Sequence, residues 1–181
     1  MEKAIIFICM LLLTTCTTPA QSKYYGKSST YKPAKLKKTH LHFFLHDVLS
    51  GAKPTAVRIA GPRTLMAFGS VYAIDDVLTE GPEATSEVVG NAQGMYMSSS
   101  QGKNLTLVMC MDLGFTAGKF KGSSLSVLSR NPVTESHREL AVVGGRGQFR
   151  RAQGTIFVKT HTVNYTNGDA VLEYNVEVVH L

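Results

Sequence analysis

Residues 39–48 read THLHFFLHDV, and this stretch decides the fold class. Its side chains alternate with a period of two, which is typical of a β-strand and not of a helix. One parity gathers large apolar residues and is the natural core face: Leu41, Phe43, Leu45 and Asp47. The other parity faces outward: His40, His42, Phe44, His46 and Val48.

The same alternation recurs along the chain. Residues 105–112 and 169–181 both alternate, and further strands are expected at 65–75, 87–98, 124–129, 140–144 and 154–163. Clusters rich in Gly and Asn separate them and are interpreted as turns, at 90–91, 101–104, 144–147 and 167–169. About eight strands without a helical stripe predict a closed antiparallel barrel or a sandwich.

The N-terminal residues form a different kind of segment. Residues 4–13, AIIFICMLLL, are an unbroken apolar run, and the small residues of 14–20 end in a cleavage-site pattern. The run is shorter than the roughly 20 residues that span a bilayer. We expect a cleaved secretory signal at 1–20, the alternative being a buried N-terminal element. The mature chain would then be extracellular, with no membrane partner.

The charge of the chain is concentrated near the expected mature N-terminus. The net charge is +6, and residues 21–39 contain six lysines and no acid. We interpret 21–39 as a basic flexible arm and 40–181 as the single folded domain. Nucleic acid is not an expected partner of an exported protein. An anionic cell-wall matrix and a purely solubilising role are the two interpretations of the arm.

Cysteine and sequon positions agree with an exported chain. Cys9 and Cys16 lie in the expected signal, so the mature chain keeps Cys110 alone and has no internal disulfide. Cys110 lies in an apolar run, which favours burial. Asn104 and Asn164 each begin an Asn-x-Thr sequon and are glycosylation candidates.

Asp47 is the informative polar residue of the first strand. A carboxylate on a core face is costly unless it is paired, hydrogen-bonded or beside a wet cavity. Desolvation raises the pKa of such a group, which suits a general acid or base. The alternative is that Asp47 turns to solvent at the strand end.

Other chemical signatures are weak. The three histidines of 40–46 have a metal-like spacing, but they are expected to face outward, where no acid or fourth ligand is evident, so no metal is expected. There is no G-x-S-x-G elbow, and the Gly-rich 144–147 does not complete a nucleotide-binding fingerprint.

Several blocks in the right order resemble the plant dirigent family. Residues 46–49 (HDVL) resemble its HD-x-L opening, and 92–96 (AQGMY) its A-Q-G-x-Y segment. Residues 138–149 (RELAVVGGRGQF) resemble its R-E-x-x-V-V-G-G-x-G-x-F block. Together the blocks cover about 40–181.

The resemblance implies a fold and an activity. It implies a calycin-like, eight-stranded antiparallel barrel that forms a homotrimer and is secreted to the plant apoplast. We expect a protein that binds phenolic (phenylpropanoid) intermediates and makes phenoxy-radical coupling stereoselective, as in lignan biosynthesis. A separate oxidase, a laccase or peroxidase, would make the radicals, so no cofactor is implied. The alternative is a quinone-methide dehydratase or cyclase, such as one that forms a pterocarpan from an isoflavanol.

The resemblance also implies site residues. Asp47, Tyr96 and Arg138 match the family's cavity aspartate, tyrosine and arginine, and we assign them catalytic roles. Core packing for Tyr96 and a salt bridge for Arg138 are the structural alternatives. Phe43, Leu45 and Asp75 are expected to line the substrate site. Asp75 and Asp76 lie at the end of an expected strand, and both are weaker candidates.

Departures from the lignan-directing pattern favour another branch of the family. Residues 121–134 contain no acid where lignan-directing members carry a second cavity aspartate, and Gln153 replaces a common arginine. A passive carrier of an apolar ligand is a further alternative. The chain lacks tryptophan, and so lacks the G-x-W signature of a lipocalin.

Overall fold

The computed structural model describes residues 26–30, 32 and 35–181. The expected signal at 1–20 and residues 21–25 of the expected arm lie outside this part of the chain. Within it, no helix is long and apolar enough to cross a membrane.

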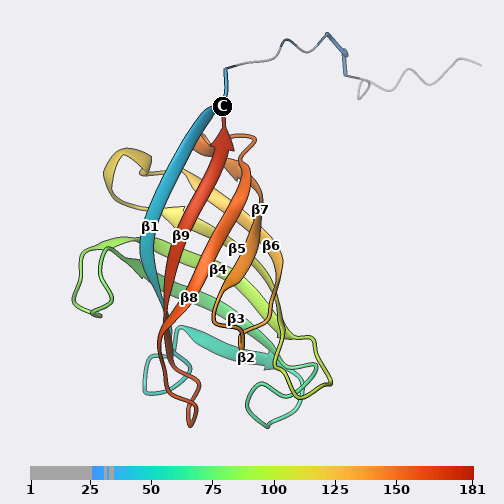
Figure 1. The fold of residues 1–181 in the computed structure, drawn as a ribbon, viewed down its shortest axis with the longest axis vertical. Coiled ribbons are helices and arrows are strands. Elements are labelled where there is room, and N and C mark those ends of the chain that lie inside the picture. The colour runs from blue at the N-terminus through green and yellow to red at the C-terminus, as the bar shows by residue number, and fades with distance from the viewer. Residues whose placement is uncertain (1–25, 31, 33–34) are drawn as a thin grey trace, which may run out of the picture. The chain divides into compact units, whose positions relative to one another are not determined.

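A closed antiparallel sheet forms the domain (Figure 1). Nine strands and two short 3-10 helices follow one another among the described residues: β1 (Lys37–Asp47), β2 (Ala56–Ala60), β3 (Val71–Thr79), β4 (Val88–Ser98), β5 (Leu107–Phe115), η1 (Gly118–Phe120), β6 (Ser124–Asn131), β7 (Arg138–Arg146), η2 (Gly147–Phe149), β8 (Gln153–Val163) and β9 (Ala170–His180). Neighbouring strands pair in the order β1-β9-β8-β7-β6-β5-β4-β3-β2.

The pairing of β1 with β3 closes the barrel and confirms the expected eight-stranded fold, with β2 as an extra strand. β1 pairs with β9 along its whole length but with β3 only at Phe44, Leu45 and His46. β2 then pairs with the earlier part of the same β3 edge, from Val71 to Ile74. Closure rules out the sandwich, because one continuous sheet joins itself through β1 and β3 and does not form two separate packed sheets.

Alternating side chains fill the barrel. On β1, Phe43 and Leu45 are buried, and Phe43 packs against Phe115 and Tyr174 with ring centroids 5.9 and 5.7 Å apart. The inward faces of the other strands carry mostly Leu, Val, Ile, Met and aromatic side chains. Burial of these side chains is the main stabilising term of a domain that has no disulfide among its described residues.

The structure corrects the expected strand boundaries. The strand expected at 65–75 is β3, shifted to Val71–Thr79, and β2 was not expected because its five residues show no clear alternation. β1 begins at Lys37 rather than at His40, so two lysines of the expected arm belong to the barrel. Lys38 Nζ lies 3.0 Å from Glu177 Oε2.

Two glycine clusters expected to be turns lie inside strands. Gly90 belongs to β4 and Gly145 to β7. A Cβ on Gly145 would lie 2.5 Å from the Phe149 carbonyl oxygen, and one on Gly90 would clash with the backbone of Gly114. These glycines therefore permit close backbone approach and do not mark chain reversals.

Cys110 is exposed, contrary to the expected burial. Its neighbours Met109 and Met111 face the core, so the strand period turns Cys110 outward. The apolar run around it reflects an outer barrel face that is itself rich in apolar side chains, including Met95 and Leu128, both exposed.

Candidate functional site

Asp47 is the last residue of β1 and lies at one end of the barrel. β1 and β3 pair antiparallel through His46 and Val77, so the same register continued by one residue places Asp47 opposite Asp76. Both side chains have the inward parity of their strands, and Asp76 is only 1% exposed. The closure of the barrel thus brings two carboxyl groups together.

Thr55 holds the second carboxyl group. The loop after β1 returns to the barrel, and the Val48 N–H donates to Thr55 Oγ1 at 3.0 Å. The Thr55 hydroxyl in turn donates to Asp76 Oδ1 at 2.6 Å. The end of β1 and the middle of β3 are therefore linked through one threonine.

The environment favours the neutral form of both acids. The pKa of Asp76 is raised to about 8, mainly by burial and also by the charge of Asp47, while the Thr55 hydrogen bond opposes the shift. Burial likewise raises the pKa of Asp47 to about 7, against the hydrogen bond from Tyr96 and with a smaller contribution from the charge of Asp169. Two facing carboxyl groups in an apolar wall resist being ionised together.

Tyr96 reaches this pair from β4. Its ring is buried and stacks on Tyr72 with centroids 5.1 Å apart, and its hydroxyl makes a long hydrogen bond of 3.5 Å to Asp47 Oδ1. Burial raises the pKa of Tyr96, and the charges of Asp47 and Asp76 add to the effect. Tyr96 therefore stays protonated and remains a donor.

Arg138 begins β7 and is buried inside the barrel. Its guanidinium donates to Thr160 Oγ1 at 2.8 Å and to Asn131 Oδ1 at 3.4 Å. Among the described residues no carboxylate lies within ion-pair distance of it, so the expected salt-bridge alternative does not apply there. Burial lowers the pKa of Arg138, although an arginine stays charged.

Two buried polar atoms, one in this arginine and one in a tyrosine, have no hydrogen-bond partner within the described part of the chain. They are Arg138 Nε and the hydroxyl oxygen of Tyr174, a fully buried residue of β9. The pKa of Tyr174 is raised mainly by burial; the charge of Arg138 opposes this, while those of Asp76 and Asp47 add to it. Tyr174 thus lies within electrostatic reach of both the acid pair and the arginine.

An open pocket reaches Asp47 of the acid pair. It has a volume of about 300 Å³ and lies between the end of β1 and the β8–β9 hairpin, where Asp47, Val163, Asn164 and Asp169 are among its lining residues. Asp169 Oδ1 accepts the N–H groups of Leu49 and Ser50 at 2.8 and 3.0 Å. The Ser50 hydroxyl donates to Asp169 Oδ2 at 2.5 Å, and this bond lowers the pKa of Asp169 most, with the two backbone bonds adding to the effect. Together the bonds tie the loop after β1 to the hairpin.

The remaining predicted residues are placed as follows. Phe43 and Leu45 are buried on the inner face of β1, on the same side of the strand as Asp47. Asp75 is exposed on the outer face of β3 and accepts a hydrogen bond from Asn91 Nδ2 at 2.8 Å. The structure does not bring Asp75 to the acid pair, because strand alternation turns its neighbour Asp76 inward instead.

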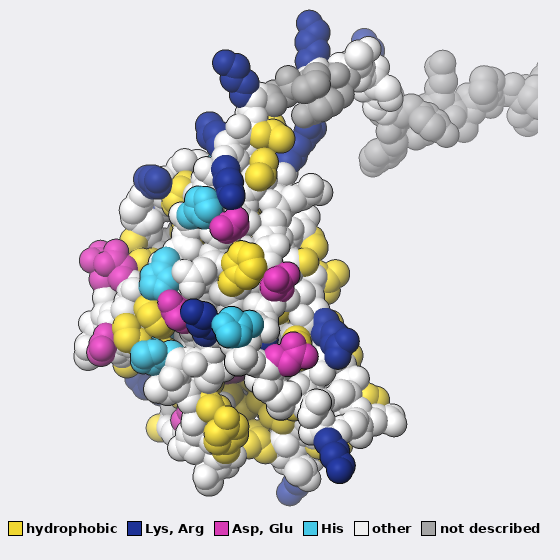
Figure 2. Space-filling model, in the orientation of Figure 1, with side chains coloured by type: hydrophobic (Ala, Val, Ile, Leu, Met, Phe, Trp, Pro, Cys, Tyr) yellow, Lys and Arg dark blue, Asp and Glu magenta, His cyan; other side chains and the backbone are white. Residues whose placement is uncertain are grey.

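Several histidine side chains are visible among acidic and basic ones on the face shown in Figure 2, and His40 and His42 of β1 are exposed. His42 Nε2 lies 2.9 Å from Glu173 Oε1, and His40 Nδ1 lies 3.5 Å from Glu177 Oε1, so acids distant in sequence do approach them. His46 is buried and bonds to Thr79 Oγ1 at 2.7 Å. The described residues contain no group of three or more ligands arranged to hold a metal.

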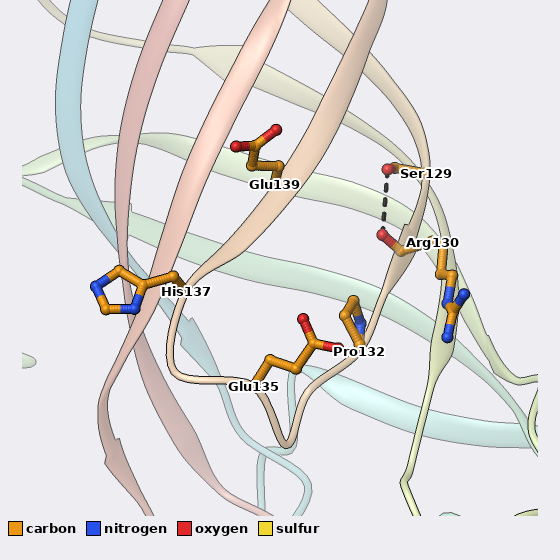
Figure 3. A pocket seen from close by; sticks show the side chains of 6 residues that line it. All are labelled: Ser129, Arg130, Pro132, Glu135, His137 and Glu139. Carbon is orange, nitrogen blue, oxygen red and sulfur yellow. Dashed lines mark hydrogen bonds between the residues drawn. The ribbon is translucent and has the colours of Figure 1, made fainter.

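A second hollow lies on the outside of the barrel at the β6–β7 hairpin (Figure 3). Its volume is about 510 Å³, and its lining includes Arg130, Glu135, His137 and Glu139. In Figure 3 the His137 and Arg130 side chains point away from each other. The charged groups do not converge, and none of them is a predicted site residue.

The described structure adds site residues that the sequence did not single out. Thr55, Asp169 and Tyr174 look unremarkable in sequence, since their roles depend on the β1 loop and on barrel closure. Asp76 had a signal: Tyr72, Ile74, Asp76 and Leu78 share one parity. The misplaced strand boundary hid that signal.

Comparison with known proteins gives consistent matches. The family model described as Dirigent-like protein matches residues 38–179. The chain is 48% identical to Dirigent protein 15 of Arabidopsis thaliana over 99% of this chain and 100% of the relative. It is 43% identical to Pterocarpan synthase 1 of Glycine max over 99% and 100%. A solved structure of a pterocarpan synthase dirigent protein superposes with a TM-score of 0.77 at 46% identity, covering 83% of this chain and 89% of that one.

Proposed function

This chain belongs to the dirigent family, and we propose that it removes water from a phenolic alcohol such as an isoflavanol and closes a new ether ring. The observation that carries the proposal is the pairing of Asp47, which is half-buried and lines the pocket, with the buried Asp76. The similarity to two pterocarpan synthases supports the same reaction class.

The reaction needs proton transfer and no redox step. A proton goes to the leaving benzylic hydroxyl, the C–O bond breaks, and the para phenol loses its proton to give a quinone methide. A second phenolic oxygen then attacks the methide carbon and loses its proton, while the quinone-methide oxygen regains one. The net change is the loss of one water, so no oxidant or cofactor takes part.

The residues of the site match these steps. Asp76 is neutral at pH 7 and is the acid for the leaving hydroxyl, and Asp47, which titrates near neutrality, accepts and returns the phenolic proton. Tyr96 donates to the developing phenolate. Arg138 Nε and the Tyr174 hydroxyl are buried without a described partner, and a substrate oxygen would satisfy both.

Stereoselective radical coupling, the first expectation from sequence, is less well supported by this site. Coupling of two radicals requires orientation but no proton donor before the bond forms. A neutral acid pair is costly to bury and has no clear part in such a step. Coupling and passive binding are therefore outcomes of the test below.

A product assay tests the proposal. The protein is incubated with isoflavanols, and separately with phenols plus a one-electron oxidant, and products are resolved by chiral chromatography. We expect ring closure of an isoflavanol, with kcat/KM lowered by about 10² to 10⁴ in Asp76→Asn and Asp47→Asn. Asp75→Asn, the exposed neighbour, is the matched control and should keep full activity.

Other results would replace the proposal. Inert isoflavanols together with a changed enantiomeric ratio in the oxidant-driven reaction would indicate a coupling guide. No change in any rate or ratio would indicate a carrier. An active Asp76→Asn protein would remove Asp76 from the proton path.

We also propose that the chain is secreted, with its first 20 residues cleaved, and that it forms a trimer. The exposed apolar side chains on the outside of β2 and β4 supply a surface for a second copy of the chain: Val57, Ile59, Met95 and Met97. Light scattering and intact-mass measurement on secreted protein test both parts. An uncleaved monomer would contradict them.

A further inference from the structure

Asn164 stands at the rim of the Asp47 pocket and also begins a glycosylation sequon. It follows the last residue of β8, Val163, and its exposed side chain helps to line the pocket. The sequon Asn164-Tyr165-Thr166 occupies the tip of the β8–β9 hairpin. The other sequon, at Asn104, lies between β4 and β5 and does not line this pocket.

The backbone of Asn164 is fixed on both sides. Its N–H donates to the Asp169 carbonyl oxygen at 2.8 Å, and its carbonyl accepts the Gly168 N–H at 2.8 Å. A group attached to Asn164 would therefore project from a defined point and not from a freely moving loop.

The side-chain amide is oriented by its own sequon. Asn164 Oδ1 accepts the Thr166 N–H at 2.9 Å. Within the described chain no acceptor is recorded for Asn164 Nδ2, the atom to which an N-linked sugar attaches. The amide nitrogen is thus available for modification in the folded hairpin.

We propose that an N-linked glycan on Asn164 forms part of the rim of the Asp47 pocket and excludes bulky substrates from it. The pocket, with a volume of about 300 Å³, suits a small aromatic molecule. A sugar at its rim narrows the entrance without touching Asp47 or Asp76. The assignment of this pocket as the substrate-binding site rests on the proposed function.

Kinetic discrimination between substrates tests the proposal. Protein from a secretory host is mapped for glycan occupancy and assayed with a small isoflavanol and with a bulky ring-substituted analogue. We expect the ratio of kcat/KM for the bulky substrate to kcat/KM for the small one to rise several-fold when the glycan is lost. The glycan is removed by Asn164→Gln, by Thr166→Ala, or by enzymatic deglycosylation of the folded wild-type protein. Thr166→Ser keeps the sequon, Asn104→Gln removes the other one, and neither should change the ratio.

A labelling measurement separates this proposal from the proposed reaction. Val163→Cys places a thiol in the pocket lining, and the exposed Cys110 on the outer barrel face serves as an internal reference. Removal of the glycan should accelerate modification of the pocket thiol by a large maleimide several-fold relative to a small one. The labelling rate at Cys110 should stay unchanged.

The outcomes are distinct. An unoccupied Asn164, or size ratios that do not respond to glycan removal in the labelling assay, would overturn the proposal. If isoflavanols do not react but glycan removal still accelerates labelling by the large maleimide, the proposed reaction is wrong. The proposal that the glycan limits access to the pocket is then still supported. Deglycosylation of the folded protein keeps the test valid even if a variant folds poorly.

Discussion

Replacement of Asp76 by asparagine should change how the stability of the barrel depends on pH. The substitution keeps the shape of the side chain and an oxygen that accepts the Thr55 hydroxyl, but it removes the titrating proton. Because Asp76 is almost fully buried, its protonation state is coupled directly to folding.

The direction follows from the raised pKa. Burial raises the pKa of Asp76 from 3.8 to about 8, so between these values the folded chain keeps a proton that the unfolded chain has released. The stability contributed by this group is therefore full below pH 4 and is lost as pH rises toward 8. At about 1.4 kcal/mol per unit, the loss between pH 4 and pH 7 is at most about 4 kcal/mol.

Urea unfolding from pH 4 to pH 8 measures this effect. Asp169 and Glu173, whose pKa values are lowered by their hydrogen bonds, contribute the opposite slope in both proteins and cancel in the comparison. The difference between wild type and Asp76→Asn therefore reports Asp76 together with its effect on Asp47. The variant should gain stability relative to wild type as pH rises. Asp75→Asn should follow the wild-type curve.

Parallel curves for wild type and Asp76→Asn would refute the reasoning. They would mean that Asp76 is ionised in the folded protein at neutral pH, and that it is not the proton donor. A difference of the opposite sign would show that the carboxylate is stabilised by a partner inside the barrel.

Four further predictions follow from the described structure. The kcat/KM for ring closure, measured from initial rates at a series of pH values, should fall as pH rises through the pKa of Asp76, about 8. Thiol reagents should modify Cys110 in the folded protein, as read by mass spectrometry, and protection would contradict its exposure. Gly145→Ala should lower the Tm through a cost of about 1–3 kcal/mol, since a Cβ meets the Phe149 carbonyl; an unchanged Tm would show that the backbone yields freely. Asp169→Asn should weaken the clamp on the loop after β1 and speed its proteolysis, whereas equal cleavage rates would show that the clamp is not limiting.

The fold was largely predictable because a strand period is a local property. The alternation at residues 39–48 correctly assigned Phe43 and Leu45 to the inner face, and similar patterns located most other strands. β2 escaped notice because a short strand whose Val57 and Ile59 are both exposed shows no apolar-in, polar-out pattern. The glycines at 90 and 145 misled because the same residue serves turns and close strand contacts.

The site was only partly predictable, since it depends on pairing between distant strands. The parity of β1 and the family resemblance singled out Asp47, but its partner Asp76 depends on the β1–β3 register, which local sequence does not encode. The contact of Tyr96 with Asp47 likewise joins β4 to β1 across the barrel. Asp75 and Asp76 were both placed at the end of the strand expected at 65–75, and this misplaced boundary gave no basis for deciding which of them faces inward.

The full-length pairing of β1 with β9 also bears on how the chain reaches its fold. Lys37 pairs with His180 and Asp47 with Ala170, so β9 covers one whole edge of β1. That edge has no partner until the ribosome has made β9. Until then the apolar face of β1 and the unpaired edge of β8 stay open to other chains. Contacts of such long sequence separation slow folding, and they place the period of greatest aggregation risk between the synthesis of β8 and the arrival of β9.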